Sequence, residues 1–368
     1  MKNFFTKNKI TILYILTFVS LISFINTIRK GLLNGCDFQW QPSVLFWQGI
    51  NHYEKFINNG KADFLCQGGE YSHLFHVILY PYTLFEWEIA RTLWLMTNVL
   101  FCFLIVYLIC KKYKFSRYKS ILLLLIFITC SPTRMAINYG QQSLFVLFFL
   151  VLPFVYKSNF FSFLSGFASI KYSTGYILYF DYLIKKEFKK FLLATIPYMM
   201  GWIVYFFYTS SNPIINFFEP LDWALNYVDY QRDADVYSLL KIYFFDSSQF
   251  YMKYFSIILI FGLNIFFLIK INKLSDNFLK MSLILICPLI FFPHSNYDYV
   301  LLFPLACYSL LNFDKLLNKI NFYFVIYFFF FSKLIKHLLD IDKIYQPLLL
   351  ISIILLTLIN IKNNAKNI

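Results

Sequence analysis

Charged residues are scarce in this sequence. Asp, Glu, Lys and Arg make up 14% of its 368 residues, whereas a typical soluble domain has about 25%. Apolar residues make up 59% of the chain, in long runs that recur along its whole length without an internal repeat or a soluble domain. These features exclude a water-soluble globular fold and predict an all-α polytopic membrane protein, with residues 1–368 forming a single integral membrane domain.

Motifs for nucleotide-driven or soluble-enzyme chemistry are also missing. The sequence contains no GxGxxG, Walker loop, GxSxG or HExxH motif. Its seven cysteines lack a metal-binding spacing, and the acids Asp229, Asp233 and Asp235 form a DxD-like pattern that arises easily by chance. We therefore expect no metal and no cofactor. A reaction would draw its energy from a preactivated substrate, and a lipid phosphate ester suits an outward-facing membrane enzyme.

The formal net charge of +14 reflects membrane topology and not a soluble basic surface. The cations lie in short loops between apolar runs instead of gathering on one soluble face, so we expect no nucleic-acid partner. By the positive-inside rule these loops are cytoplasmic, together with both termini. Most of the acids lie in two long loops, at about 29–88 and 209–253. The sequence therefore predicts a multi-pass protein of the plasma or inner membrane whose polar working surface faces away from the cytoplasm.

Apolar runs predict about 10–13 transmembrane or re-entrant helices. We expect the first run to be a retained helix and not a signal peptide, because no cleavage site follows it. Two short neighbouring runs predict either a re-entrant hairpin or two tilted half-helices. The expected helices are 10–28, 89–110, 119–131, 142–156, 160–170, 175–184, 191–208, 254–270, 281–292, 297–313, 321–333 and 346–361.

The first outer loop is long and varied. Residues 38–49 predict a short helix lying in the membrane interface. Cys36 and Cys66 share this loop, so a disulfide is possible if the loop faces an oxidising compartment. Tryptophans cluster in the outer loops and at the outer ends of spans. We assign Trp94 to an interfacial aromatic belt, whereas Trp40 could equally stack on a sugar or a lipid.

Asp37, just past the first predicted span, is the leading candidate for chemistry. A partly desolvated carboxylate there can act as a general base on a hydroxyl. The alternative is an N-cap, because Asp before an amphipathic segment caps a helix well.

Three further groups could line a site on the same side of the membrane. Gly140-Gln141 offers close backbone approach and an amide for sugar hydroxyls, or simply starts a helix. Lys171, between the two half-helices, needs an anionic partner such as a phosphate unless it snorkels to the surface, and Arg134 is a second cation nearby. His294 could bind phosphate or donate a proton, and Asp298 could pair with a cation or cap a helix.

In order, these pieces resemble the membrane glycosyltransferases of family 87. The resemblance covers roughly residues 10–310 and rests on the order and spacing of short motifs. Those motifs are Asp37-Phe38, Gly49-Ile50-Asn51-His52-Tyr53, Tyr80-Pro81, Trp94 with Asn98, Gly140-Gln141, Gly166 with Lys171, and Pro293-His294-Ser295.

The resemblance implies a C-type glycosyltransferase bundle that moves a hexose, mannose in this family, from a polyprenyl-phosphate donor to a glycolipid or glycan hydroxyl. It maps the general base onto Asp37. It maps the cation near the donor phosphate onto Lys171 and a cavity-wall residue onto Gln141. His294 matches more loosely, and Tyr53 and Arg134 complete the expected substrate-binding set.

This sequence departs from the family pattern at three places. Ser143 stands where the family usually has Asn, and Tyr82 stands where it usually has a second Pro. Asn296 and Asp298 replace a Trp and a later His. The last two departures concern the acceptor side of the expected site more than the donor chemistry.

Two other functions fit parts of the pattern. A transporter or flippase of a lipid-linked sugar would also have broken helices and intramembrane cations, but it predicts symmetric interruptions that this sequence lacks. A polymerase or ligase of surface glycans would use lipid diphosphates and place its large loop late in the chain.

Overall fold

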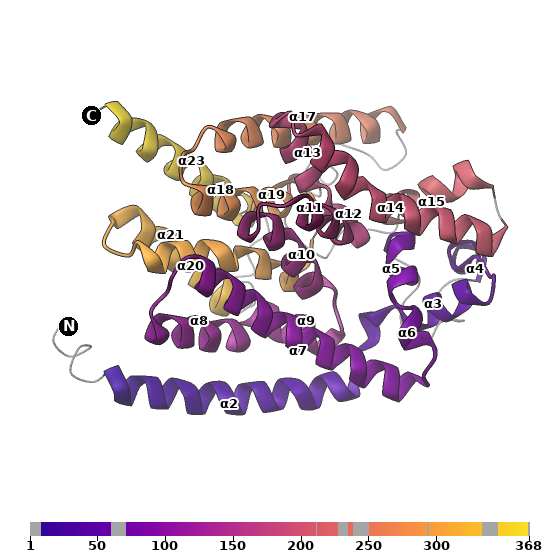
Figure 1. Ribbon diagram of the computed structural model, residues 1–368, viewed down its shortest axis with the longest axis horizontal. Coiled ribbons are helices and arrows are strands. Elements are labelled where there is room, and N and C mark those ends of the chain that lie inside the picture. The colour runs from indigo at the N-terminus through magenta and orange to yellow at the C-terminus, as the bar shows by residue number, and fades with distance from the viewer. Residues whose placement is uncertain are drawn as a thin grey trace.

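The computed structural model describes residues 9–59, 71–210, 212–226, 235–237, 250–292, 294–332 and 345–366. Throughout these ranges the regular structure is helical, without a strand. The prediction of an all-α fold is therefore confirmed. Figure 1 shows the helices as a bundle whose long members run along the horizontal axis of the view.

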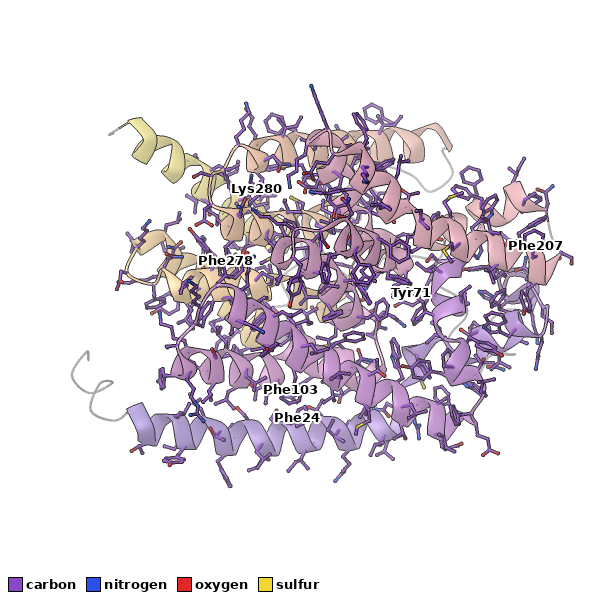
Figure 2. All side chains as sticks on the ribbon, viewed as in Figure 1. Phe24, Tyr71, Phe103, Phe207, Phe278 and Lys280 are labelled. Carbon is purple, nitrogen blue, oxygen red and sulfur yellow. The ribbon has the colours of Figure 1, made fainter. Side chains whose placement is uncertain are left out.

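Among the described residues, three helices are long and apolar enough to cross a membrane. They are α2 (Lys9–Leu33), α7 (Trp87–Lys112) and α14 (Phe188–Thr209). Helix α2 lies at the edge of the bundle and leaves large apolar side chains exposed, including Phe18 at 66% and Ile25 at 59%. On its inner side, Phe24 meets Phe103 of α7 with ring centroids 6.3 Å apart (Figure 2). The outer face of α2 is thus suited to lipid.

A bent pair of helices makes a fourth candidate span. Helices α8 (Arg117–Thr129) and α9 (Ser131–Tyr139) meet at 54°. Cys130 between them has an extended backbone, and Pro132 occupies the first turn of α9. Proline has no N–H and fits a helix start but not a helix interior, so the chain changes direction here. The bend carries the end of α9 toward the outer loop.

Shorter helices form the centre of the bundle. The predicted pair of half-helices is present, and its break falls at Lys171, whose backbone is extended. The central helices are α10 (Ser143–Val155), α11 (Asn159–Ser165), the 3-10 helix η3 (Gly166–Ile170), α12 (Tyr172–Gly175) and α13 (Ile177–Ile184).

The C-terminal third adds a second group of helices around this centre. It contains α17 (Phe250–Asn272), α18 (Asn277–Ile284), α19 (Cys287–Phe291), the 3-10 helix η4 (Asn296–Leu302), α20 (Phe303–Leu311), α21 (Leu316–Ile326), the π-helical turn η5 (Tyr327–Phe331) and α23 (Tyr345–Lys366). Several of these are apolar but shorter than a span, and together with the three or four candidate spans of the described residues they agree with a multi-pass membrane protein.

The two predicted outer loops contain short helices. The first holds the 3-10 helix η1 (Cys36–Phe38), α3 (Trp40–Trp47), α4 (His52–Asn59), α5 (His73–Ile78) and α6 (Tyr80–Thr83), and the second holds α15 (Pro213–Asn226). The short helix predicted within residues 38–49 is present as α3, and its place in the membrane interface stays a prediction. Helices α4, α5, α6 and α15 were not predicted. Helices α3 to α6 and α15 gather at one end of the bundle, opposite the N-terminal end of α2 and the C-terminal end of α23 (Figure 1).

Candidate active site

Four chain segments come together near the inner side of the first outer loop. They are η1, the turn from α9 to α10, the break at Lys171, and the start of η4. Helix α9 contacts both η1 and η4, while α10 contacts η3, α12 and η4. The helix breaks predicted from the sequence are therefore also the places where polar residues meet.

Two glycines fix how η1 sits on the turn between α9 and α10. Gly35, the N-cap of η1, has φ +46°, and Gly140, which ends α9, has φ +72°. The amide of Gly35 donates to the carbonyl of Asn138 at 3.1 Å. A Cβ added to Gly140 would lie 3.0 Å from the carbonyl oxygen of Gly35. Glycine is therefore required at 140 both by the left-handed backbone and by the close approach.

An aromatic stack holds η1 from the other side. Phe38 is fully buried and stacks on Trp94 with ring centroids 5.1 Å apart. The indole Nε1 of Trp94 donates to the carbonyl of Gly140 at 2.7 Å. Trp94 is only 1% exposed, so its assignment to an interfacial aromatic belt was wrong. Trp94 instead joins η1 to the turn at Gly140.

Asp37 is the middle residue of η1. Gln39, and not Asp37, occupies the N-cap position of α3, so the alternative interpretation of Asp37 as a helix cap is wrong. The side chain of Asp37 lies outside the described side chains, and its role as a base stays a prediction. Its backbone position follows from the contacts of its neighbours Gly35 and Phe38.

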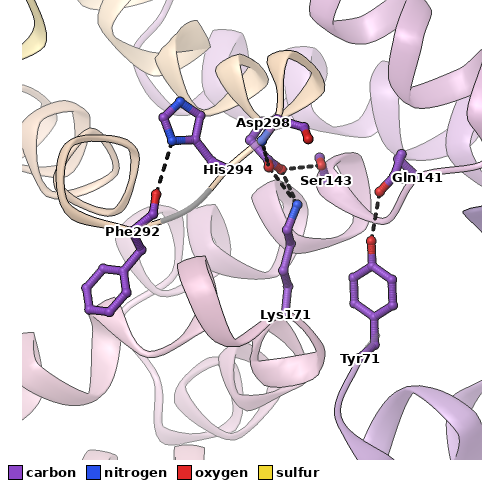
Figure 3. A network of polar contacts seen from close by, with 8 residues as sticks. Tyr71, Gln141, Ser143, Lys171, Phe292, His294 and Asp298 are labelled. Atoms are coloured by element: carbon purple, nitrogen blue, oxygen red, sulfur yellow. Dashed lines mark hydrogen bonds and ion pairs between the residues drawn. The ribbon is translucent and has the colours of Figure 1, made fainter. Parts of the chain in front are cut away.

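Gln141 and Tyr53 are connected through Tyr71. The hydroxyl of Tyr71 donates to Oε1 of Gln141 at 2.8 Å (Figure 3). The hydroxyl of Tyr53 donates to the backbone carbonyl of Tyr71. All three residues are buried. The structure thus brings two of the predicted substrate-binding residues into one hydrogen-bonded chain, from the outer loop to the turn at Gly140.

Lys171 and Asp298 form a buried ion pair. The Nζ of Lys171 lies 2.5 Å from Oδ1 and 2.6 Å from Oδ2 of Asp298. Lys171 is 9% exposed and Asp298 1%, so Lys171 does not snorkel to the surface. Asp298 also accepts from the backbone N–H of Ser295 at 3.0 Å, within a capping box at the start of η4. Asp298 therefore both pairs with a cation and caps a helix.

Two departures from the expected motif pattern contact each other. The hydroxyl of Ser143 donates to Oδ1 of Asp298 at 2.5 Å (Figure 3). Sequence reasoning treated these positions as separate changes in different motifs, 155 residues apart. The structure shows that they form one interaction, and spacing alone gave no signal for it.

His294 and Arg134 lie on segments next to η4, which carries Asp298. Nδ1 of His294 is 3.1 Å from the carbonyl of Phe292, and its ring packs edge-on against Tyr299. Arg134 lies on α9, which packs against η4. Its Nε is buried with no hydrogen-bond partner in the described part of the chain. Arg134 is therefore a second, half-buried cation on a helix that packs against η4.

The sequence did not reveal a cluster of histidines in the first outer loop. His52, His73 and His76 are all buried, and the rings of His52 and His76 lie 4.2 Å apart. Ser43 Oγ is 2.9 Å from Nδ1 of His76, and the hydroxyl of Tyr205 is 3.3 Å from Nδ1 of His52. The only sequence signal was the spacing of His73 and His76 on one helical face.

The cysteine and metal predictions fall only partly on described residues. Cys36 is in a disulfide bond, and its expected partner, Cys66, lies outside the described residues. Among the described residues, no group of three or more His, Cys, Asp or Glu side chains is arranged to hold a metal ion. Asp229 and Asp233 of the possible DxD-like pattern lie outside those residues.

Comparison with known families adds one finding. A family model described as glycosyltransferase family 87 matches residues 71–293, which is more than half of the chain. The match includes the turn at Gly140, the break at Lys171 and the approach to η4. No curated protein and no solved structure matches the chain.

Proposed function

The chain belongs to glycosyltransferase family 87, and from this premise we propose that it moves a hexose from a polyprenyl-phosphate donor to a hydroxyl of a glycolipid or glycan. The expected hexose is mannose, and the expected face of the membrane is extracytoplasmic. The observation that carries the proposal is the meeting of η1, the turn at Gly140, Lys171 and η4 in one place, since each supplies a residue of the expected site.

The proposed reaction is a single displacement at the anomeric carbon of the sugar. The Asp37 carboxylate takes the proton of the acceptor hydroxyl as that oxygen forms the new glycosidic bond. The bond between the anomeric carbon and the phosphate oxygen breaks, and its electron pair leaves with the polyprenyl phosphate. Attack from the face opposite the phosphate inverts the configuration of the anomeric carbon.

The cations of the site have their role at the leaving group. Lys171, with Arg134 and His294 near it, would stabilise the negative charge that develops on the departing phosphate. Gln141, fixed by Tyr71, would bind sugar hydroxyls, and Tyr53 supports Tyr71 from behind. The polyprenyl chain would lie between the helices at the lipid-facing edge of the bundle.

Substitution of the proposed base tests this function. Asp37→Asn keeps the size of the side chain but removes its basicity, so turnover should fall by about 10²–10⁴-fold while donor binding is retained. The measurement is release of polyprenyl phosphate from a radiolabelled polyprenyl-phosphate sugar in proteoliposomes supplied with crude glycolipid. The matched control is Glu54→Gln, which changes an exposed acid of the same loop and should leave turnover unchanged.

Two outcomes would contradict the proposal. Wild-type activity in Asp37→Asn would remove Asp37 from the role of base. Movement of the intact donor between leaflets, without acceptor-dependent release of polyprenyl phosphate, would favour a flippase of the lipid-linked sugar over a transferase.

A further inference from the structure

The buried ammonium of Lys171 already has a counter-ion within the protein. Both oxygens of Asp298 lie within 2.6 Å of it, and the ring of Tyr297 lies 4.8 Å from it on another side. An unpaired charge in this position would be costly. Asp298 therefore offsets the charge of Lys171 when no anionic ligand is bound.

The two partners differ in how they are held. Asp298 accepts from Ser143 as well as from the Ser295 amide, so its carboxylate is fixed between α10 and η4. Its side chain is 1% exposed, whereas the side chain of Lys171 is 11% exposed. The lysine is therefore the more accessible partner of the pair.

We propose that Asp298 is a positioning residue that competes with the phosphate of the donor for Lys171. Its carboxylate orients the ammonium in the empty site, and the arriving phosphate loosens the pair by taking over part of the same ammonium. Ser143 tunes the competition because its hydroxyl shares Oδ1 with Lys171. This inference rests on the proposed function, in which Lys171 faces the donor phosphate.

The competition predicts opposite effects of two substitutions. Asp298→Asn leaves the ligand phosphate as the only full counter-ion of Lys171, so phosphate affinity should rise about fivefold or more, the usual lower range of coupling between two ligands of one group. Ser143→Ala removes a donor that shares the carboxylate, so the ion pair tightens and phosphate affinity should fall.

The experiment measures binding of farnesyl monophosphate to the full chain in detergent, with farnesol as the uncharged control. The variants are wild type, Asp298→Asn, Ser143→Ala, Lys171→Met and the double variant Lys171→Met/Asp298→Asn. The double variant removes both charges, so it keeps the buried region neutral and should bind as weakly as Lys171→Met. In turnover assays, Asp298→Asn should lower both KM for the donor and kcat, because affinity rises while the ammonium loses its orientation.

A second ion pair provides the matched control. Lys185 lies 2.5 Å from Oδ2 of Asp181, whose side chain is also 1% exposed, near the end of α13. Asp181→Asn should lower thermal stability without changing the affinity for farnesyl monophosphate. A loss of affinity in Asp298→Asn that matches its loss of stability would overturn the proposal, because a purely structural role predicts that result.

The remaining outcomes separate this inference from the proposed function. Equal affinity for farnesyl monophosphate in wild type and Lys171→Met would overturn the proposed competition. The transfer assay on Asp37→Asn would still test the proposed function. The predicted affinity changes without any sugar transfer would support the competition and contradict the glycosyltransferase. If Asp298→Asn does not fold, Ser143→Ala and the double variant still decide, since unchanged affinity in Ser143→Ala overturns the proposal.

Discussion

At the scale of single residues, the buried imidazoles of the first outer loop make the stability of the protein depend on pH. Burial, and then the charge of neighbouring His73, lowers the pKa of His76 to about 3. Burial and the neighbouring His76 and His73 lower the pKa of His52 well below its ordinary value. Both residues are therefore neutral in the native state at pH values where the unfolded chain would bind protons.

The groups around these imidazoles would stabilise a protonated histidine only weakly. Tyr53 and Tyr205 pack against His52. The carboxylate of Glu219 accepts from Asn51 at 2.9 Å, and burial raises the pKa of Glu219. Glu54 is exposed. Protonation of the cluster is thus opposed by burial more than it is favoured by neighbouring acids.

We predict that acidification destabilises the first outer loop. Between the native pKa of about 3 for His76 and the unfolded value of about 6.5, the unfolded state binds more protons, so the free energy of unfolding falls as pH falls. Each such histidine contributes up to about 1.4 kcal/mol per pH unit. His76→Gln should reduce the slope of the free energy of unfolding with pH, measured by denaturant unfolding between pH 7 and 5, by up to about that amount.

Ser43→Ala is the control for this experiment. It removes the hydrogen bond to Nδ1 of His76 but leaves the titrating ring in place, so the pH dependence should persist. Parallel pH profiles for wild type and His76→Gln would contradict the assignment of the effect to this residue.

The sequence predicted residue types better than their partners. A buried lysine at a helix break requires an anion, and an acid at a helix start suits a cation or a cap, so both Lys171 and Asp298 were recognised. Their pairing depends on how η3, α12 and η4 pack against α10, which no local pattern encodes. Trp94 was misplaced for the same reason, because its position at the outer end of a span fits the interface and the buried site equally well.

At the scale of elements, breaks between helices build the site. The apolar runs are interrupted at three positions. Cys130 is extended and is followed by the proline in the first turn of α9, Gly140 ends α9 in a left-handed conformation, and Lys171 is extended. Hydropathy predicted most of the helices because periodicity and length are local properties. It missed α9 because that helix is short and polar, and it missed α4, α5, α6 and α15 because they are short helices within the two acid-bearing loops.

We predict that Gly140→Ala reduces activity by displacing η1. An alanine at φ +72° costs about 1–2 kcal/mol in backbone strain. Its Cβ would also press on the Gly35 carbonyl, 3.0 Å away, and so move the segment that carries Asp37. The measurement is transfer activity together with melting temperature.

The control is Gly262→Ala in α17, where an added Cβ meets nothing within 4 Å. That variant should be as stable as wild type or slightly more so, because alanine favours a helix. Full activity in Gly140→Ala would show that the contact between Gly35 and Gly140 does not position η1.

At the scale of the whole molecule, the bundle has two unlike ends. The short helices of the outer loops occupy one end, while the turn from α7 to α8 and the turn from α20 to α21 lie at the other (Figure 1). These turns and the adjoining helix ends carry Lys111, Lys112, Lys114, Lys315 and Lys319. This separation agrees with the distribution of charge along the sequence, and the positive-inside rule supplies the proposed orientation.

Labelling of single introduced cysteines tests that orientation. Ile50→Cys, in the first outer loop and 40% exposed, should react with a membrane-impermeant maleimide in intact cells. Leu316→Cys, at the start of α21 and 72% exposed, should react only after permeabilisation. The native chain gives a low background because its described free cysteines are all buried. The reverse labelling pattern would invert the proposed topology.

The carboxylate of Asp298 joins segments that are made at different times. Lys171 precedes it by 127 residues and Ser143 by 155. At about 5–20 residues per second, roughly 6–25 s of synthesis separate the lysine from its counter-ion. During membrane insertion Lys171 must therefore stay hydrated or bind a temporary anion. The pocket reaches its final charge balance only when η4 has been delivered, so nascent chains that stop before Asp298 lack the finished site.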